Sequence, residues 1–113
     1  MKFLCLAYGD EAGWKSLSDD ERRETLAQDA EIRDNGNLMS AVRTSTTSVT
    51  NWNKHLEIVQ QPYSQHKLPL AGFSVIEAKD ADEVVRLVSN TPCARARGVI
   101  EIRPLWEHEG DRV

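Results

Sequence analysis

The feature that most constrains the fold of this sequence is a pair of capped helices set between strand-like segments. In the first, Ser18 and Glu21 form a capping-box pattern, and Asn35-Gly36 supplies a stop. The sequence therefore predicts a helix over residues 19–34. Its apolar side is thin, which indicates one side on a sheet and a broad solvated face. The apolar positions expected to face the sheet are Leu26, Ala27, Ala30 and Ile32.

The second helix is predicted within residues 79–92. Asp80 and Glu83 repeat the capping-box spacing, and Pro92 lies just beyond the expected end. Between them runs an apolar stripe at helical spacing, so this helix also packs on a sheet. The stripe consists of Val84, Val85, Leu87 and Val88.

Strand-like segments surround these helices. Residues 3–8 are continuously apolar, which is typical of a strand covered on both faces. Residues 37–50 are rich in Thr, Val and Ser and predict a strand that breaks near 43–45. Turn-forming Asn residues at 51–54 predict a hairpin between this segment and the next. The later strands are expected at residues 55–59, 70–78 and 97–107.

This order predicts an α+β fold of the ferredoxin-like type, β-α-β-β-α-β with an extra hairpin. Both helices then cover one face of an antiparallel sheet. One chain of this length has no third layer for the other face. A second copy packed sheet to sheet would supply that cover, so we expect a homodimer.

Length and charge limit the classes of protein to consider. The 113 residues suffice for one domain, expected over residues 1–106 with a charged tail at 107–113. The net charge is −4 and the 14 Lys and Arg residues are dispersed, which argues against nucleic-acid binding.

The N-terminus and the cysteines bear on localisation. Only six consecutive apolar residues lie between Lys2 and Gly9, fewer than the roughly 7 to 15 of a signal-peptide core and the ~20 of a membrane span. Cys5 and Cys93 are too few for a disulfide scaffold, so we expect packed thiols in a reducing cytoplasm, with no membrane partner.

Three segments together resemble a known family: KFLCLAYGDEAGWKSLSDDE, LAGFSVIEAKDADEVVRLV and the closing GVIEIRPL. The chain is similar to the YCII-related family, also called the DGPF-domain family, over residues 1–106. The resemblance implies a dimeric α+β barrel, distantly akin to muconolactone isomerase-like enzymes. It also implies a cleft that in much of the family carries an acidic residue and sometimes a histidine partner.

The sequence departs from the family at its Asp-Gly-Pro-Phe motif. Here the chain reads Gln60-Gln61-Pro62-Tyr63, so a neutral amide replaces the aspartate. An amide can orient a substrate through hydrogen bonds but cannot exchange a proton at neutral pH. The chemistry has therefore either moved to neighbouring groups or been lost.

The loop 60–69 holds the main candidates for a site. His66 has an imidazole suited to proton transfer near neutrality, although a solvated loop histidine is the slightly favoured interpretation. Tyr63 can donate to a ligand oxygen or simply pack as a ring, and Gln60 can orient a substrate. Lys67 can bind a carboxylate, with a surface lysine as the simpler interpretation.

Other candidates stand at predicted strand ends. Tyr8 and Asp10 end the first strand and Arg43 ends the second, so the three can rim one cavity. Asp10 can also be only a turn residue, and Arg43 is the better anion anchor because guanidinium pairs with carboxylate. His55 is more simply an exposed strand residue, and His108 belongs to the tail.

Several other kinds of site are not supported by the sequence. It contains no catalytic triad that can be read from spacing, no phosphate-binding loop and no metal-ligand spacing. We therefore expect no metal and no cofactor. Packing in a dimer interface or a cavity wall is the default role for Trp14, Trp52 and Trp106.

The residues leave more than one function open. The first is a cofactor-independent isomerase or lyase acting on a small organic acid or lactone, with His66 transferring the proton. The alternative is a non-catalytic dimeric module that binds a small ligand or regulates, and the missing aspartate argues for it. A weaker third possibility is a protein that works only through its exposed surface.

Overall fold

The computed structural model describes residues 1–106, which form one layer of helices on one antiparallel sheet. The predicted charged tail, with His108, lies outside the described residues. No helix among residues 1–106 combines the length and the apolar character needed to cross a bilayer. In chain order the elements are β1 (Lys2–Tyr8), α1 (Glu11–Lys15), α2 (Asp19–Asp34), β2 (Leu38–Ala41), β3 (Ser48–Trp52), β4 (His55–Val59), β5 (Leu70–Glu77), α3 (Ala81–Val88), α4 (Pro92–Arg95) and β6 (Val99–Pro104).

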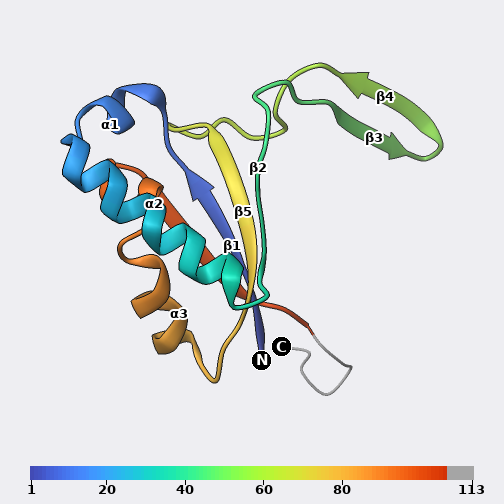
Figure 1. The fold of residues 1–113 in the computed structure, drawn as a ribbon. Coiled ribbons are helices and arrows are strands. Elements are labelled where there is room, and N and C mark those ends of the chain that lie inside the picture. The colour runs from blue at the N-terminus through green and yellow to red at the C-terminus, as the bar shows by residue number, and fades with distance from the viewer. Residues whose placement is uncertain (107–113) are drawn as a thin grey trace.

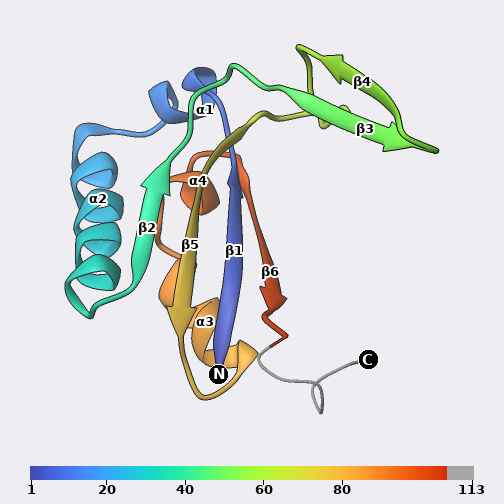
Figure 2. The same cartoon turned by 90° about the vertical axis from the view of Figure 1, so that its right-hand side faces the viewer.

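The main sheet has the strand order β2-β5-β1-β6, with every neighbouring pair antiparallel. Figure 1 shows all the helices on one side of this sheet, and Figure 2 shows the four strands side by side. The α+β, ferredoxin-like prediction is thus confirmed. The helices cover one face because the two helical connections, β1 to β2 and β5 to β6, cross the sheet on the same side.

Strands β3 and β4 form a separate two-stranded hairpin. The predicted break at residues 43–45 falls in the unpaired segment 42–47, and the predicted hairpin is confirmed. Its turn residues Asn53 and Lys54 have φ angles of 54° and 64°, which suits a two-residue hairpin turn even without an Asn-Gly pair. The hairpin extends away from α2 and α3, toward the uncovered side of the sheet (Figure 1).

The predicted helix caps are present in the structure. The Ser18 hydroxyl accepts a hydrogen bond from the Glu21 N–H, and the Glu21 carboxylate accepts one from the Ser18 N–H, each at 3.1 Å. At α3 the Asp80 carboxylate accepts from the Glu83 N–H at 2.9 Å. The returning bond differs from the predicted capping box, since the Glu83 carboxylate accepts from the Lys79 N–H.

Two short helices were not predicted by the sequence pattern. The segment expected to be only a turn contains α1, where the Asp10 side chain accepts from the Gly13 N–H at 2.9 Å. Pro92, expected only to terminate the second helix, also begins α4 as its first residue. Helices of four or five residues are too short to show an apolar period, so only their caps could have revealed them.

The inward face of α2 differs from the predicted one. Leu26 is 50% exposed and Ala27 is also exposed, whereas Thr25 and Ile32 are buried. Gln28 and Asp29 share this inward face and are partly buried, with the Gln28 amide donating to the Leu87 carbonyl at 2.8 Å. Hydropathy predicted Ile32 correctly and Ala30 is partly buried, but Leu26 and Ala27 were placed on the wrong side because polar side chains take part in the packing. The core that α2 covers consists of Phe3, Cys5, Ile32, Ile76, Ala78, Val84 and Val88.

The sheet face away from the helices, the open face, has no cover within the described chain. Strand alternation places Leu4 and Leu6 on it, half-buried, opposite Phe3 and Cys5. The expectation that β1 is covered on both faces is thus not met within one chain. The open face consists of Leu4, Leu6, Tyr8, Leu38, Ser40, Phe73, Val75, Val99, Glu101 and Arg103.

The capping box at the start of α2 gives a test of the fold. Replacing Ser18 with Ala should lower the free energy of unfolding by about 1 kcal/mol, because the Glu21 N–H loses its acceptor. Urea denaturation measures this change. Ser45→Ala, in the exposed segment before the hairpin, should alter stability by less than about 0.5 kcal/mol. Equal effects of the two substitutions would contradict the role of the cap.

Candidate functional site

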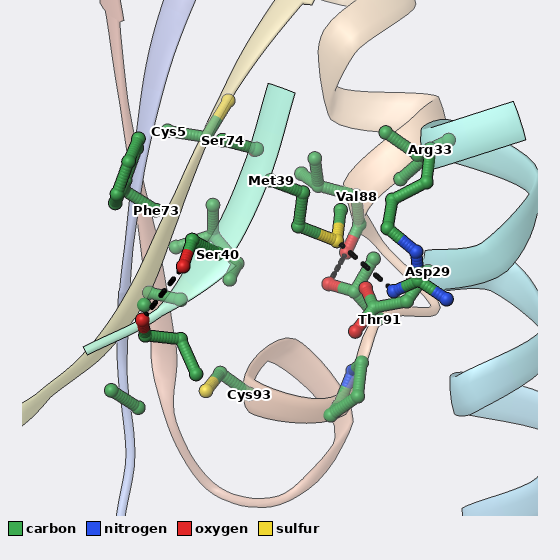
Figure 3. Close-up of a pocket in the computed structure, with 17 residues that line it drawn as sticks. Cys5, Asp29, Arg33, Met39, Ser40, Phe73, Ser74, Val88, Thr91 and Cys93 are labelled. Carbon is green, nitrogen blue, oxygen red and sulfur yellow. Dashed lines mark hydrogen bonds between the residues drawn. The ribbon is translucent and has the colours of Figure 1, made fainter. Parts of the chain in front are cut away.

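A cavity of about 280 Å³ lies between α2, α4 and the sheet (Figure 3). It exists because the sheet residues beneath α2 are small, among them Ala7, Ala41 and Gly72. Gly72 also allows β2 to approach closely, since a methyl group there would lie 2.7 Å from the Ser40 carbonyl oxygen. The cavity is larger than the 150 Å³ cavity that accommodates benzene in an engineered protein core, so a ring with a substituent fits.

The charged groups that line the cavity lie at its helical end. Figure 3 shows Asp29, Arg33 and Thr91 there, with Phe73 and Cys5 at the opposite end. The Thr91 hydroxyl donates to the Val88 carbonyl at 2.6 Å, so its proton is engaged. Arg33 lies with Nη1 3.8 Å from the Met39 sulfur. Among residues 1–106, the Asp29 carboxyl has no hydrogen-bond or ion-pair partner.

The charge state of Asp29 is set mainly by burial. Burial raises the pKa of the Asp29 carboxyl, and the positive charge of Arg33 offsets part of that rise. A carboxyl whose pKa is raised titrates closer to neutral pH, so it is better suited to exchange protons with a ligand. Asp29 is therefore the group in this cavity most suited to acid–base chemistry.

The two cysteines of the cavity are free thiols. Burial raises the pKa of Cys93, and the negative charge of Asp29 raises it further. Burial also raises the pKa of Cys5, while a hydrogen bond with Ser74 acts in the other direction. Both thiols stay protonated at neutral pH, so neither is activated as a nucleophile. No three His, Cys, Asp or Glu side chains of residues 1–106 converge as metal ligands.

A second, more open groove of about 570 Å³ adjoins the cavity. Ala71, Pro92 and Cys93 line both spaces. We call the first space the inner cavity and the second the outer groove. The remaining lining of the outer groove comes from Gly9, Asp10, Glu11, Trp14, Val42, Thr44, Pro69, Leu70 and Ala96.

The structure brings together two of the residues predicted from the sequence. The rings of Tyr8 and His66 have centroids 4.9 Å apart and are tilted by 50°. Ser64 Oγ lies 3.4 Å from His66 Nε2. Tyr8 continues the row of Leu4 and Leu6, so this pair stands at one end of the open face rather than in the inner cavity.

The other predicted site residues are dispersed. Tyr63 is 85% exposed, and the Gln60 side-chain oxygen accepts from the Thr47 hydroxyl at 2.8 Å. Asp10 caps α1 and lines the outer groove. Arg43 and Lys67 are exposed and make no hydrogen bond or ion pair with any residue of the described range. None of these five, nor Tyr8 and His66, lines the inner cavity.

The remaining histidines and tryptophans have diverse surroundings. His55 is exposed beside Glu57, with 3.6 Å between Nε2 and Oε1. Trp14 lines the outer groove and lies under the Arg22 guanidinium, 5.6 Å from the ring centroid. Trp52 and Trp106 are 76% and 56% exposed, so neither packs inside the core of this chain.

Asp29 was missed by sequence reasoning. The signal for it is its spacing, four residues after Thr25 and three before Ile32, which puts it on the same face as these two buried residues. A search for apolar periodicity passes over a carboxyl in that stripe. Recognising the buried positions of α2 would have required knowing which face meets the sheet.

The comparisons with known proteins bear on the family. The sequence profile of the YCII-related domain matches residues 1–109. The chain belongs to the YCII-related family. A solved structure, the 5-chloro-2-hydroxyhydroquinone dehydrochlorinase of Burkholderia phenoliruptrix AC1100 in complex with 2,5-dihydroxybenzoquinone, is similar at 18% identity, a TM-score of 0.45 and coverage of 97% of each chain. Among proteins with curated functions, none matches this sequence significantly.

The raised pKa of Asp29 predicts a pH-dependent effect on stability. A carboxyl whose pKa is higher in the folded state stabilises the fold while protonated, and this contribution is lost as pH rises through the folded pKa. Asp29→Asn should therefore increase the free energy of unfolding at pH 8. The expected gain is on the order of 1 kcal/mol, the usual size of a single-substitution effect. The gain should disappear below pH 4.

Urea denaturation at both pH values measures this difference. The titratable groups facing Asp29 across the cavity are Arg33, Cys5 and Cys93, and neither the guanidinium nor a protonated thiol changes charge between pH 4 and 8. Glu31→Gln, on the exposed side of α2, serves as the control and should change stability by less than about 0.5 kcal/mol at either pH. A pH-independent effect of Asp29→Asn would contradict the assignment.

Proposed function

We propose that this YCII-related protein is a cofactor-independent isomerase or lyase that acts on a small organic acid or lactone in the inner cavity. The observation that supports this proposal is the Asp29 carboxyl, which faces the cavity and has no partner among residues 1–106. Arg33, at the same end, has a guanidinium suited to a substrate carboxylate or carbonyl oxygen. The family's motif aspartate is absent, and Asp29 supplies a carboxyl from another element.

In this scheme the ionised Asp29 accepts a proton from a carbon next to the substrate carbonyl. The electron pair of that C–H bond moves into a new carbon–carbon double bond, and the carbonyl oxygen takes up negative charge near Arg33. An isomerase returns the proton from Asp29 to another carbon. A lyase uses the same electron pair to expel a leaving group from the adjacent carbon.

A second proton-transfer site is favoured by the contact between Tyr8 and His66. Here His66 transfers the proton on the open face, and Tyr8 donates a hydrogen bond to the substrate oxygen. Tyr63 and Gln60 would orient the substrate, and Arg43 or Lys67 would hold its carboxylate. The non-catalytic alternative keeps the inner cavity as a binding site for a small ligand without turnover.

Exchange of carbon-bound hydrogen in deuterium oxide distinguishes these proposals without knowledge of the natural substrate. Cyclohexanone fits the inner cavity and carries exchangeable hydrogens next to its carbonyl. The wild-type protein should accelerate their exchange, followed by NMR, and Asp29→Asn should reduce this acceleration about 100-fold, since a general base contributes 10²–10⁴. His66→Ala should leave the acceleration unchanged.

The opposite pattern would assign the chemistry to His66 and the open face. Binding of cyclohexanone by NMR titration without any accelerated exchange would support the non-catalytic module. Circular dichroism of both variants should match that of the wild-type protein, which separates loss of chemistry from loss of fold.

We also propose that the protein is a homodimer formed by the open face. Leu38 and Val99 are 59% and 54% exposed there, on strands at opposite edges of the sheet. The rim holds the Arg103 and Glu101 ion pair, with 2.7 Å between Nε and Oε1, which suits an interface with an apolar centre and a polar edge. Such an interface would bury roughly 1,200–2,000 Å².

The hairpin supports the same proposal. Cross-strand pairing puts Val49 and Ile58 on one face with Leu56, and these three side chains are 57–60% exposed. An isolated two-stranded hairpin is only marginally stable in water, so this apolar face gains from a cover. A second copy packed on the open face would lie on the side toward which the hairpin extends (Figure 1).

A charge placed on the open face should weaken the dimer. We expect the wild-type protein to sediment as a dimer and Leu38→Lys to shift it to monomer, because the lysine would be desolvated without a partner. Sedimentation velocity over a concentration series measures the change. Leu26→Lys, at a similarly exposed position on α2, should remain dimeric. A wild-type monomer at all concentrations would exclude the dimer.

The free thiols support a reducing compartment. Cys5 is buried, Cys93 is partly buried, and they are not joined in a disulfide. We therefore propose a cytoplasmic location, where thiols are kept reduced.

A further inference from the structure

The inner cavity and the outer groove adjoin each other. Ala71 on β5 and Pro92 and Cys93 on α4 line both, so the two spaces meet at these three residues. The inner cavity of about 280 Å³ is at the lower end of the usual range for small-molecule sites, whereas the outer groove adds about 570 Å³. A ligand confined to the inner cavity would leave the adjoining outer groove unfilled.

We propose that the substrate is an elongated amphipathic compound, with a compact polar head in the inner cavity and an unbranched apolar tail of about four to six carbons in the outer groove. This inference deepens the proposed function, since it rests on the inner cavity as the site of the head. It assigns the outer groove to substrate binding. It also places Cys93 at the neck, the point where the inner cavity meets the outer groove.

The chemistry of the outer groove selects an apolar tail. Its walls include Trp14, Val42 and Leu70, which offer no charge to a ligand. The carboxylates at its rim already have hydrogen-bond or ion-pair partners. The Asp10 carboxylate accepts from the Gly13 N–H, and Glu11 pairs with Lys15 at 3.1 Å. A polar tail would therefore lose its water without new partners, which is costly.

The proposed neck lies at Cys93, which lines both spaces. A methyl group placed on Gly9 would lie 3.0 Å from Cys93 Sγ, so the thiol already packs closely against the β1–α1 connection. The thiol is protonated at neutral pH and therefore behaves as a small, weakly polar group. An unbranched methylene chain suits such a neck better than a branched or charged one.

Binding of cyclohexanone and 4-butylcyclohexanone tests the inference. Each buried methylene strengthens binding by roughly fourfold, so the butyl compound should bind the wild-type protein at least about tenfold more tightly. Val42 is partly exposed and lines only the outer groove of the two spaces. Val42→Trp should therefore remove the gain from the butyl group and leave the affinity for cyclohexanone unchanged. NMR titration of the backbone amides measures both affinities.

Val85→Trp is the matched control, because Val85 is exposed on α3 and lines neither space. It should preserve the affinity gain from the butyl group. Equal affinity of the two ketones for the wild-type protein, or an undiminished gain in Val42→Trp, would overturn the inference. The two affinities do not depend on the hydrogen exchange catalysed by Asp29. Tighter binding of the butyl compound without any exchange would therefore refute the proposed enzyme activity and still support the outer groove as the site of the tail.

Discussion

The packing of α2 on the sheet is the contact on which the rest of the structure depends. Thr25, in the middle of α2, and Ile32, near its C-terminal end, are buried, and Gln28 and Asp29 lie between them. Gln28 satisfies its polar group by donating to the Leu87 carbonyl, which ties α2 to α3. Asp29 has small residues opposite it instead of a partner. The helix thus packs on the core through Thr25 and Ile32, while Asp29 between them lines the inner cavity.

This arrangement costs stability in two ways. An unfilled cavity loses the dispersion contacts that an apolar side chain would make there. A half-buried carboxyl opposes its own ionisation, as the raised pKa of Asp29 shows. A leucine in place of Asp29 would relieve both losses and remove the only carboxyl among residues 1–106 that lines the inner cavity. Such a departure from the most stable sequence is typical of functional sites.

The two proposed proton-transfer sites occupy opposite sides of the same sheet. Asp29 stands on the helical side within one chain, while Tyr8 and His66 lie on the open face that a second copy would cover. The inner cavity is complete without a partner, whereas a site at His66 would depend on the dimer. Each arrangement supplies a proton-transfer group from outside the segment Gln60-Gln61-Pro62-Tyr63.

The elements that local rules govern were determined by the sequence alone. The Ser18 and Asp80 caps, the strand periods and the hairpin turn are set within a few residues, and they sufficed for the ferredoxin-like order. The tertiary structure decided the inward face of α2 and therefore the position of Asp29. The inner cavity joins β1, α2, β5 and α4, and its shape depends on how closely small residues let these elements approach. The distance of approach between these elements depends on packing between segments that are far apart in the sequence. The hydropathy pattern along the chain does not encode it.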